Sequence, residues 1–178
     1  VGALLLIAPR SIDPYLPIID TLQIPTVVCE SVFVDSQGQM LEPGLTCIAS
    51  DNRGGAYEGC DYLFRLGHRR MAYISGSDVG QNRLRFMGYC DALAARNMRV
   101  LEEYVRSGDW SWESGYQQTC ALLDLPRPPS AILCASDNMA LGAMRAAAER
   151  GLNVPADISI LGFDDIPAAS HSDPPLST

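Results

Sequence analysis

The sequence predicts an α/β fold in which helices cover both faces of parallel sheets, and two features lead to this prediction. Short apolar runs alternate with longer amphipathic stretches along the whole chain. Strands separated by helices of about 10 to 15 residues are typical of a doubly wound parallel sheet. Runs such as Ala131–Ala135 are also apolar throughout, as strands buried on both faces are. At 178 residues, the chain is long enough for one or two compact units.

The first third of the chain predicts three strands and two helices. Turn residues at Gln23–Pro25 separate the first helix from the second strand, and Gly67 ends the second helix. The expected elements are a strand at Ala3–Ala8, a helix at Pro14–Leu22, a strand at Pro25–Cys29, a polar loop at Ser31–Gly44, a strand at Leu45–Ala49 and a helix from about Asn52 to Leu66.

The remainder predicts four strands and three helices in strict alternation. Gly151 ends the last of these helices, and the last strand runs into turn residues. The expected elements are a strand at Met71–Ser75, a helix at Asn82–Asn97, a strand at Tyr104–Ser107, a helix at Ser111–Leu123, a strand at Ala131–Ala135, a helix at Asn138–Arg150 and a strand at Ile158–Phe163.

Charge and composition exclude several classes of function for these residues. The net charge of −8, from 13 arginines against 21 acidic residues, would repel a nucleic-acid backbone. No apolar run approaches the roughly 20 residues of a membrane span, so we expect no membrane contact. Six cysteines occur without a CxxC pair and two histidines without HxxxH spacing. We therefore expect free, mostly buried thiols in the cytoplasm, with no metal and no cofactor.

Catalytic motifs are absent from the sequence. The segment Ser75–Gly80 follows a strand but lacks the GxSxG pattern of a nucleophile elbow. The chain contains no P-loop, no GxGxxG motif and no cysteine with a credible base beside it. We therefore predict that the protein is not an enzyme.

The segment Gly151–Thr178 carries the strongest indication of a binding site. The strand Ile158–Phe163 ends in Asp164 and Asp165 and gives way to turn residues. An open α/β sheet binds its ligands at the carboxyl ends of its strands, so we expect Asp164 to accept hydrogen bonds from a ligand. The alternative is an aspartate that only stabilises a turn, a role that we assign to Asp165.

Several motifs in order resemble the effector-binding domain of the lactose-repressor (LacI/GalR) family of bacterial transcription regulators. The motifs are Asp51-Asn52 with Gly55-Ala56, Leu66–Ile74, Arg85–Tyr89, Gly108–Trp110 with Gly115-Tyr116, Asp137–Ala143, Gly151–Ser159, Gly162–Asp165 and Pro175–Thr178. Each motif alone is weak, and their order along the chain makes the resemblance specific. It covers nearly every residue after the first strand.

The resemblance implies a periplasmic-binding-protein-like fold, in which two lobes enclose a ligand cleft. On this basis we expect residues 1–67 to be the C-terminal portion of the N-terminal lobe, which is incomplete in this chain. Residues 68–178 are then the C-terminal lobe. The helix-turn-helix headpiece that holds operator DNA in the family is expected to be absent from this chain, and the family also implies a homodimer.

Arg85 is the residue most strongly indicated as a ligand contact. It lies near the start of a helix that follows the strand Met71–Ser75, and strand-to-helix edges face ligand sites. Its planar fork can bind paired hydroxyls or a carboxylate, and the family's ligand-binding arginine occupies this setting. The alternative, a solvated helix arginine, suits Arg83 better, because Arg83 points about 200° away round the helix.

Three further residues are predicted near the ligand. Trp110 follows a strand and can stack on a sugar or base, although it could also be a core residue; Trp112 is the better packing candidate. Ser136 stands where many relatives carry asparagine, and Gln81 lies in the loop before Arg85. Asp137 is expected to be the N-cap of the helix that follows it.

Two more predictions concern other parts of the chain. Leu141, Met144 and Arg145 are candidates for a dimer interface, because their helix also presents a pattern of alanines that permits close packing. The alternative is that this pattern packs against the lobe's own elements. His68 is expected to satisfy backbone groups where the chain crosses between the lobes.

The resemblance predicts the effector-sensing part of a transcriptional repressor, in which a small molecule couples lobe closure to operator binding. A sugar or sugar acid is favoured, because polyols offer paired hydroxyls on an apolar ring face; relatives that bind purines share the arginine and aspartate. The alternative is a periplasmic solute-binding protein of a transport system.

Overall fold

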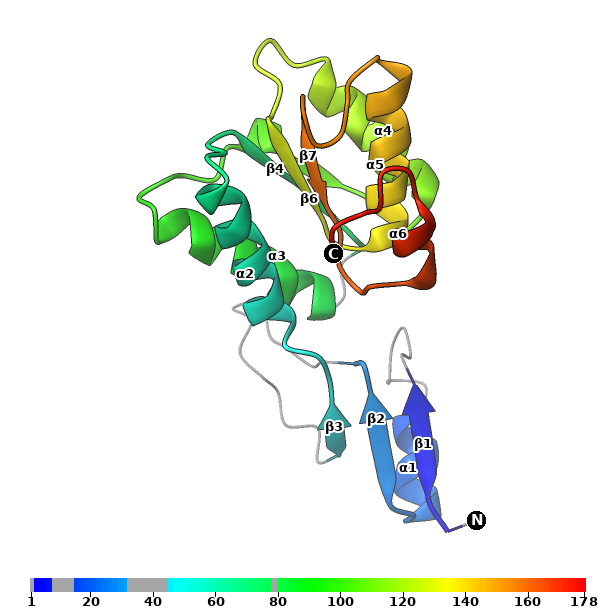
Figure 1. Cartoon of the computed structure of the whole chain (residues 1–178). Coiled ribbons are helices and arrows are strands. Elements are labelled where there is room, and N and C mark those ends of the chain that lie inside the picture. Colours follow the sequence, from blue (N-terminus) through cyan, green and yellow to red (C-terminus); the bar gives the residue numbers. More distant parts are fainter. Residues whose placement is uncertain (1, 8–14, 32–44, 78–79) are drawn as a thin grey trace.

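A computed structural model describes residues 2–7, 15–31, 45–77 and 80–178 of the chain. The chain forms a small lobe from its N-terminal residues and a larger lobe from the rest (Figure 1). An extended segment, Ala49–Asp51, leads from one lobe to the other. Most of the loop expected at Ser31–Gly44 lies outside the described residues, as do Ala8 and Pro14 at the ends of two expected elements.

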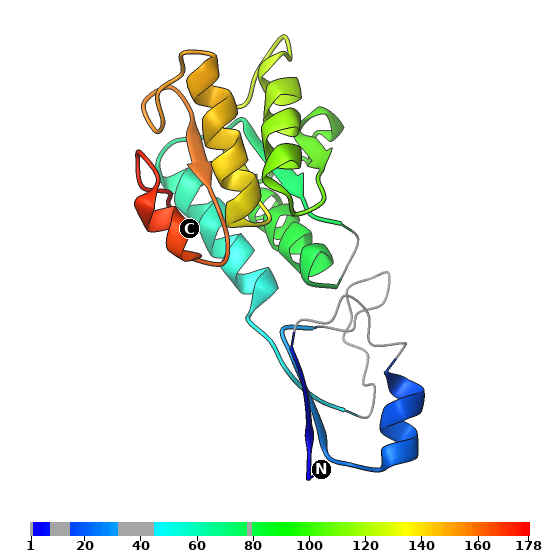
Figure 2. The same ribbon diagram turned by 90° about the vertical axis from the view of Figure 1, so that its right-hand side faces the viewer.

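The small lobe is a parallel sheet with a helix on one face. Strands β1, β2 and β3 are hydrogen-bonded in that order, and α1 packs against them (Figure 2). Ile19 and Val28 form its small core. On the opposite face Leu5, Ile7 and Ile48 are each more than half exposed. The elements are β1 Leu4–Ile7, α1 Leu16–Leu22, β2 Thr26–Cys29 and β3 Thr46–Ile48.

The large lobe has a four-stranded parallel sheet in the order β5-β4-β6-β7. Helices α2 and α3 cover one face of this sheet, and α4 and α5 cover the other (Figures 1 and 2). The elements are α2 Asn52–Arg65, β4 Met71–Ser75, α3 Gly80–Ala94, β5 Val105–Ser107, α4 Trp112–Leu123, β6 Ala131–Cys134, α5 Asp137–Glu149, β7 Ser159–Leu161 and α6 Pro167–His171.

The core of the large lobe explains why these segments form buried strands. Every residue of β6 and the first four of β4 are buried, because helices lie on both sides of the sheet. Tyr73 of β4 stacks on Tyr89 of α3 with ring centroids 5.2 Å apart. The hydroxyl of Tyr89 donates to the carbonyl of Met71 at 2.9 Å. Burial raises the pKa of both tyrosines, so their hydroxyls remain protonated.

Helix α2 belongs by its packing to the large lobe, which corrects the expected division of the chain at residue 67. Its apolar side chains Ala56, Cys60, Leu63 and Phe64 are buried, and the last three join the core cluster built around β4 and β6. An amphipathic helix is placed by whatever buries its apolar stripe, and here α3 and the large sheet do so. The change of lobe therefore falls between β3 and α2.

Several element boundaries differ from the sequence predictions. Helix α3 ends at Ala94 rather than at Asn97, because Asn97 adopts a left-handed conformation with φ 56°. A short 3₁₀ turn at Glu102–Tyr104 precedes β5. Strand β7 stops at Leu161, and the next amide, that of Gly162, donates to the carbonyl of Ser177. Helix α6 was not predicted.

His68 binds two side chains rather than the backbone groups that the sequence suggested. Its Nδ1 lies 3.0 Å from the hydroxyl of Ser130 and its Nε2 lies 2.9 Å from that of Ser159. Because Ser130 precedes β6 and Ser159 begins β7, the ring ties these two strands together at their amino ends. Burial lowers the pKa of His68, which keeps this bridging ring neutral.

All six cysteines are free thiols in the structure. Cys60 and Cys134 are fully buried, and the other four are half-buried. Burial raises the pKa of Cys60 to about 12, which leaves that thiol protonated and unreactive at neutral pH.

Candidate functional site

The candidate site lies at the carboxyl edge of the large sheet, where the order of the strands reverses. From β4 the chain passes to β5 on one side and then to β6 on the other. Such a switch point leaves a crevice outside the strand ends in which α/β proteins bind ligands. Each strand is followed there by a segment of the site: Gly76-Ser77 after β4, Gly108–Trp110 after β5, Ala135–Ser136 after β6 and Gly162–Asp164 after β7.

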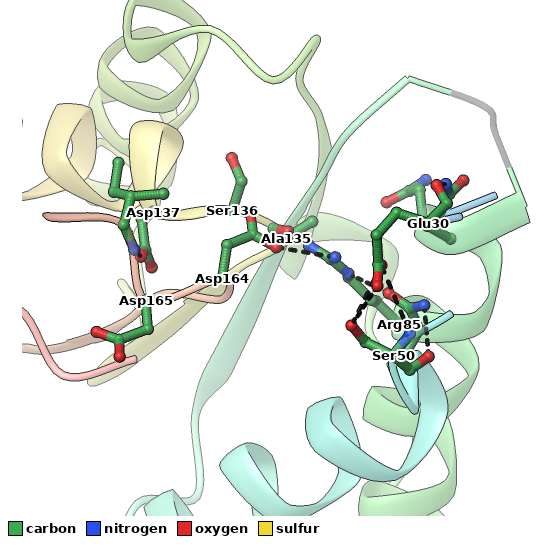
Figure 3. Close-up of polar contacts among 12 residues, drawn as sticks. Glu30, Ser50, Arg85, Ala135, Ser136, Asp137, Asp164 and Asp165 are labelled. Carbon is green, nitrogen blue, oxygen red and sulfur yellow. Dashed lines mark hydrogen bonds and ion pairs between the residues drawn. The ribbon is translucent and has the colours of Figure 1, made fainter. Parts of the chain in front are cut away.

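Arg85, from the second turn of α3, is the central side chain of this edge (Figure 3). Only 7% of the residue is exposed. Its Nε donates to Oδ1 of Asn52 at 2.7 Å, its Nη1 donates to the carbonyl of Ala135, and its Nη2 lies 2.9 Å from Oδ1 of Asp164. All three nitrogens of the guanidinium therefore already hold protein acceptors, which fixes its plane.

Two aromatic rings lie against the same guanidinium. Its central carbon is 3.8 Å from the ring centroid of Phe163 and 5.8 Å from that of Trp110. The indole nitrogen of Trp110 donates to Oγ of Ser77 at 2.6 Å. The ring covers Gly76 so closely that an added Cβ would lie 2.2 Å from it. The glycine and the serine together hold the indole beside Arg85, where a ligand could stack on it.

Asp164 pairs with Arg85 from a strained turn. Its φ of 110° is uncommon for a residue with a side chain and is typical of functional sites. Partial burial raises the pKa of Asp164, the charge of Arg85 opposes this change, and Asp137 and Glu30 add to it. The carboxylate is 38% exposed, so a ligand can reach it.

Asp137 fixes that turn and is not the N-cap that the sequence predicted. Ser136 is the N-cap of α5, because its Oγ accepts from the amide of Met139. Asp137 is the first helical residue and is fully buried. Its amide donates to the carbonyl of Phe163 and its Oδ2 accepts from the amide of Ile166, both at 2.9 Å. These two bonds bracket Asp164.

Two further predicted site residues, Ser136 and Gln81, and two residues predicted to be structural, Asp165 and Trp112, have the following positions. The hydroxyl of Ser136 is occupied in capping α5, at a position that is 5% exposed, so its contact with a ligand stays a prediction. Gln81 donates from Nε2 to the carbonyl of Glu30 and thus contacts the small lobe. Asp165 lies in the turn with its side chain pointing away from Arg85 (Figure 3). Trp112 is 40% exposed and stacks on Tyr116, so it is a surface residue.

Asn52 and Phe163 contribute to the site without having been identified from the sequence. Asn52 begins α2, is 1% exposed and also donates from Nδ2 to the carbonyl of Ser50 at 3.0 Å. The hydroxyl of Ser50 donates to the carboxylate of Glu30 at the end of β2. A continuous path of hydrogen bonds thus runs from Arg85 to the small lobe. Both residues stand inside motifs of the family resemblance, but their spacing gives no sign of a contact with Arg85.

A hollow of about 640 Å³ adjoins the site between α2 and the end of β7. Phe163 and Asp164 belong to its lining, together with Gly55 and Gly59 of α2. Arg85 and Trp110 do not line it, so we assign the binding chemistry to the strand edge and not to this hollow.

The predicted interface residues Leu141, Met144 and Arg145 line a second groove, of about 420 Å³, on the outer side of α5. Met144 is only 8% exposed, and Arg145 pairs with Glu149 at 2.7 Å. The alanine pattern of this helix packs inside the lobe, where Ala140, Ala143, Ala146 and Ala147 are inaccessible to solvent.

The described part of the chain contains neither a cluster of metal-binding side chains nor a membrane-spanning helix. Among its residues, no three His, Cys, Asp or Glu side chains come together as metal ligands would. Within the same residues no helix combines the length and the apolar character that a membrane span requires.

Comparison with known proteins agrees with this architecture. Residues 60–178 match the periplasmic binding protein-like domain. The HTH-type transcriptional repressor CytR of Escherichia coli K12 is 41% identical over 135 residues, which are 75% of this chain and 40% of that protein. The chain thus spans about 40% of the length of the curated relatives that it matches.

Two solved structures extend the match to nearly the whole chain. The transcriptional regulator CelR in complex with cellobiose superposes with a TM-score of 0.87 at 32% identity, over 99% of this chain and 53% of that chain. The lac repressor dimer bound to operator and an anti-inducer superposes with a TM-score of 0.82 at 33% identity, over 99% and 59%. These relatives are transcriptional regulators and not enzymes. The chain therefore belongs to the periplasmic binding protein-like domain family, as an effector-binding domain of the LacI/GalR type.

Proposed function

We propose that this chain is the effector sensor of a bacterial transcriptional repressor that acts in the cytoplasm. The observation that carries the proposal is the cluster of Arg85, Asp164 and Trp110 at the switch point of the large sheet. It combines hydrogen-bond donors, an acceptor and an aromatic face, which suit a small molecule with hydroxyl groups on a ring. The cellobiose complex of a related regulator supports a sugar-like ligand.

Binding is coupled to DNA through the arrangement of the two lobes. An effector held by Arg85 and Asp164 would also act on the small lobe, through Asn52, Ser50 and Glu30. To move a population from 1:99 to 99:1, the effector must prefer one arrangement about 10⁴-fold, or roughly 5.5 kcal/mol. The net charge of −8 repels phosphate, so these residues do not hold operator DNA themselves. As in the HTH-type repressors that the chain resembles, a helix-turn-helix headpiece outside these residues would hold it.

A periplasmic solute-binding protein has the same kind of fold but is not favoured. The relatives that match this chain at about 40% identity are repressors. The Leu66–Ile74 and Gly151–Ser159 motifs also resemble those of the repressors.

We further propose that the repressor is a dimer through the outer face of α5. Leu141 and Arg145 line the groove there. The variant Leu141→Arg places a charge in this groove, and we expect it to sediment as a monomer where the parent sediments as a dimer. Arg99→Glu, on the exposed loop after α3, is the control and should remain dimeric. A Leu141→Arg protein that stays dimeric would exclude this face.

Thermal denaturation of the full-length protein with sugars, nucleosides and amino acids tests the effector site. A ligand at 100 times its Kd adds about 2.7 kcal/mol of stability, which raises the Tm by several degrees. We expect both Arg85→Ala and Asp164→Ala to abolish this rise, because each removes a partner of the ligand's hydroxyl groups. Arg83→Ala, two residues away on the same helix, should retain it. A rise that survives both site substitutions would place the effector elsewhere.

A further inference from the structure

We propose that Arg65, Arg69 and Arg96 form a docking patch for an acidic segment of a partner protein, which they contact through neighbouring carboxylates. The patch lies at the end of α2 that points away from the small lobe (Figure 1). The candidate ligand site adjoins the other end of this helix, where Asn52 contacts Arg85. The patch is therefore a second and separate surface of the large lobe.

A single carboxylate holds two of these arginines. Nη2 of Arg65 lies 2.6 Å from Oδ2 of Asp61, one helical turn earlier, and Nη2 of Arg96, just beyond the end of α3, donates to Oδ1. The side chain of Asp61 is only 10% exposed, whereas those of Arg65 and Arg96 are 75% and 43% exposed. The buried acid thus fixes both cations at the surface and can balance the charge of only one.

Arg69 adds a third fixed cation. Its Nη1 donates to the carbonyls of Phe64 and His68, at 3.1 and 2.8 Å, and it makes no ion pair with any described residue. The central carbons of Arg69 and Arg96 lie 5.8 and 5.7 Å from the ring centroid of Phe64, so both guanidiniums border the same side chain. Three arginines against Asp61 leave two positive charges without a partner.

Stabilisation of the end of α2 explains one of these arginines but not all three. A cation near the C-terminus of a helix is favourable, and Arg69 supplies it through its bond to the carbonyl of Phe64. Three like charges on one small surface repel one another, and an anionic partner would relieve that repulsion. Because the guanidiniums are already ordered, they lose little side-chain entropy when they bind.

The charge of the remaining chain favours a short acidic protein segment over a nucleic acid. Apart from the three arginines and Asp61, the chain has 10 arginines against 20 acidic residues, which repel a phosphate backbone that continues past the patch. The ring of Phe64 beside the guanidiniums is 4% exposed, so bases cannot stack on it. Leu66, next to Arg65, is 57% exposed and offers the apolar contact that is common at protein interfaces.

Arginine footprinting of the full-length protein with phenylglyoxal tests the patch residue by residue. The probe is octaglutamate, and mass spectrometry gives the rate of modification of each arginine. In about 50 mM salt, where screening is weak, we expect octaglutamate to slow the modification of the three patch arginines at least three-fold. Arg127, exposed on the loop before β6, is the control and should react at its usual rate. Absence of this protection, or equal protection by an eight-nucleotide oligothymidylate, would overturn the inference.

Two matched double variants separate the effect of charge from that of folding. Arg65→Gln/Arg69→Gln removes two positive charges, so we expect octaglutamate no longer to protect Arg96. Arg65→Lys/Arg69→Lys keeps the charges and should retain the protection. Protection that survives in the glutamine variant, or is lost equally in both variants, would contradict a contact made through charge. The footprint of the parent decides the question even if the glutamine variant does not fold.

Sedimentation of the glutamine variant tests whether a second copy of the chain is the partner. We expect its oligomeric state to match that of the parent, because the patch is assigned to a different protein. A change of assembly in Arg65→Gln/Arg69→Gln, but not in the lysine variant, would assign the patch to contacts between copies and overturn the proposed partner.

Discussion

Gly142→Ala is expected to lower the free energy of unfolding by about 3 kcal/mol, because it forces apart two helices that touch through their backbones. A Cβ on Gly142 of α5 would lie 2.1 Å from the carbonyl oxygen of Trp112 in α4. On α4, a Cβ on Gly115 would lie 2.1 Å from the carbonyl oxygen of Met139. Each helix thus meets the other at a glycine. Alanine is the better helix former by about 1 kcal/mol, so a loss of stability isolates the clash.

Urea denaturation of Gly142→Ala beside Gly151→Ala measures this effect. Gly151 has φ +74°, and a methyl group added to it would meet nothing within 4 Å. Its substitution should therefore cost only about 1 kcal/mol, from the left-handed backbone. If Gly142→Ala is as stable as the parent, α4 and α5 do not pack this closely.

The close contact between α4 and α5 explains the pattern of small residues in the sequence of α5. Alanines and a glycine at close spacing predict close packing, but the partner could be a second subunit or the same lobe. Ala140, Ala143 and Ala147 are in the core of the large lobe, so the pattern reports packing within the lobe. The evidence for a dimer face therefore rests on the groove beside Leu141 and Arg145, and not on these alanines.

The strands of the large lobe were predictable because their sequences are simple. The bounds of Met71–Ser75 agree with the prediction at both ends, and those of Ala131–Cys134 agree to within one residue. A short apolar run between turn residues is rarely anything other than a buried strand. The lobe to which α2 belongs was not predictable in this way. An amphipathic stripe shows that a helix is covered, but the covering element is decided by tertiary packing.

The candidate site was predictable in its chemistry and less so in its geometry. Arg85, Asp164 and Trp110 were expected to be neighbours because they follow strands of one parallel sheet, and the structure places them together. Nothing in the sequence reveals the positive φ of Trp110 and Asp164. The sequence also did not show that Ser136, and not Asp137, is the N-cap of α5, since either residue type can cap a helix.

Asn52→Leu is expected to lower the free energy of unfolding by about 3 kcal/mol and to weaken the response to effector. Leucine has the same shape but leaves Nε of Arg85 without its partner, and it removes one of the two hydrogen bonds that the carbonyl of Ser50 accepts from residue 52. Asn52 is 1% exposed, so water cannot replace the lost bonds, and an unsatisfied buried group costs about 1–3 kcal/mol, more when it is charged.

Asn52→Asp separates the two hydrogen bonds of Asn52. It keeps an acceptor for Arg85 and loses only the donor to Ser50, so we expect a loss of about 1 kcal/mol. Denaturant unfolding and effector titration of both variants give the comparison. Equal losses in the two variants would mean that Asn52 does not hold Arg85. A larger loss in Asn52→Leu, with a weaker effector response, would identify Asn52 as the residue through which the ligand site is tied to the segment joining the lobes.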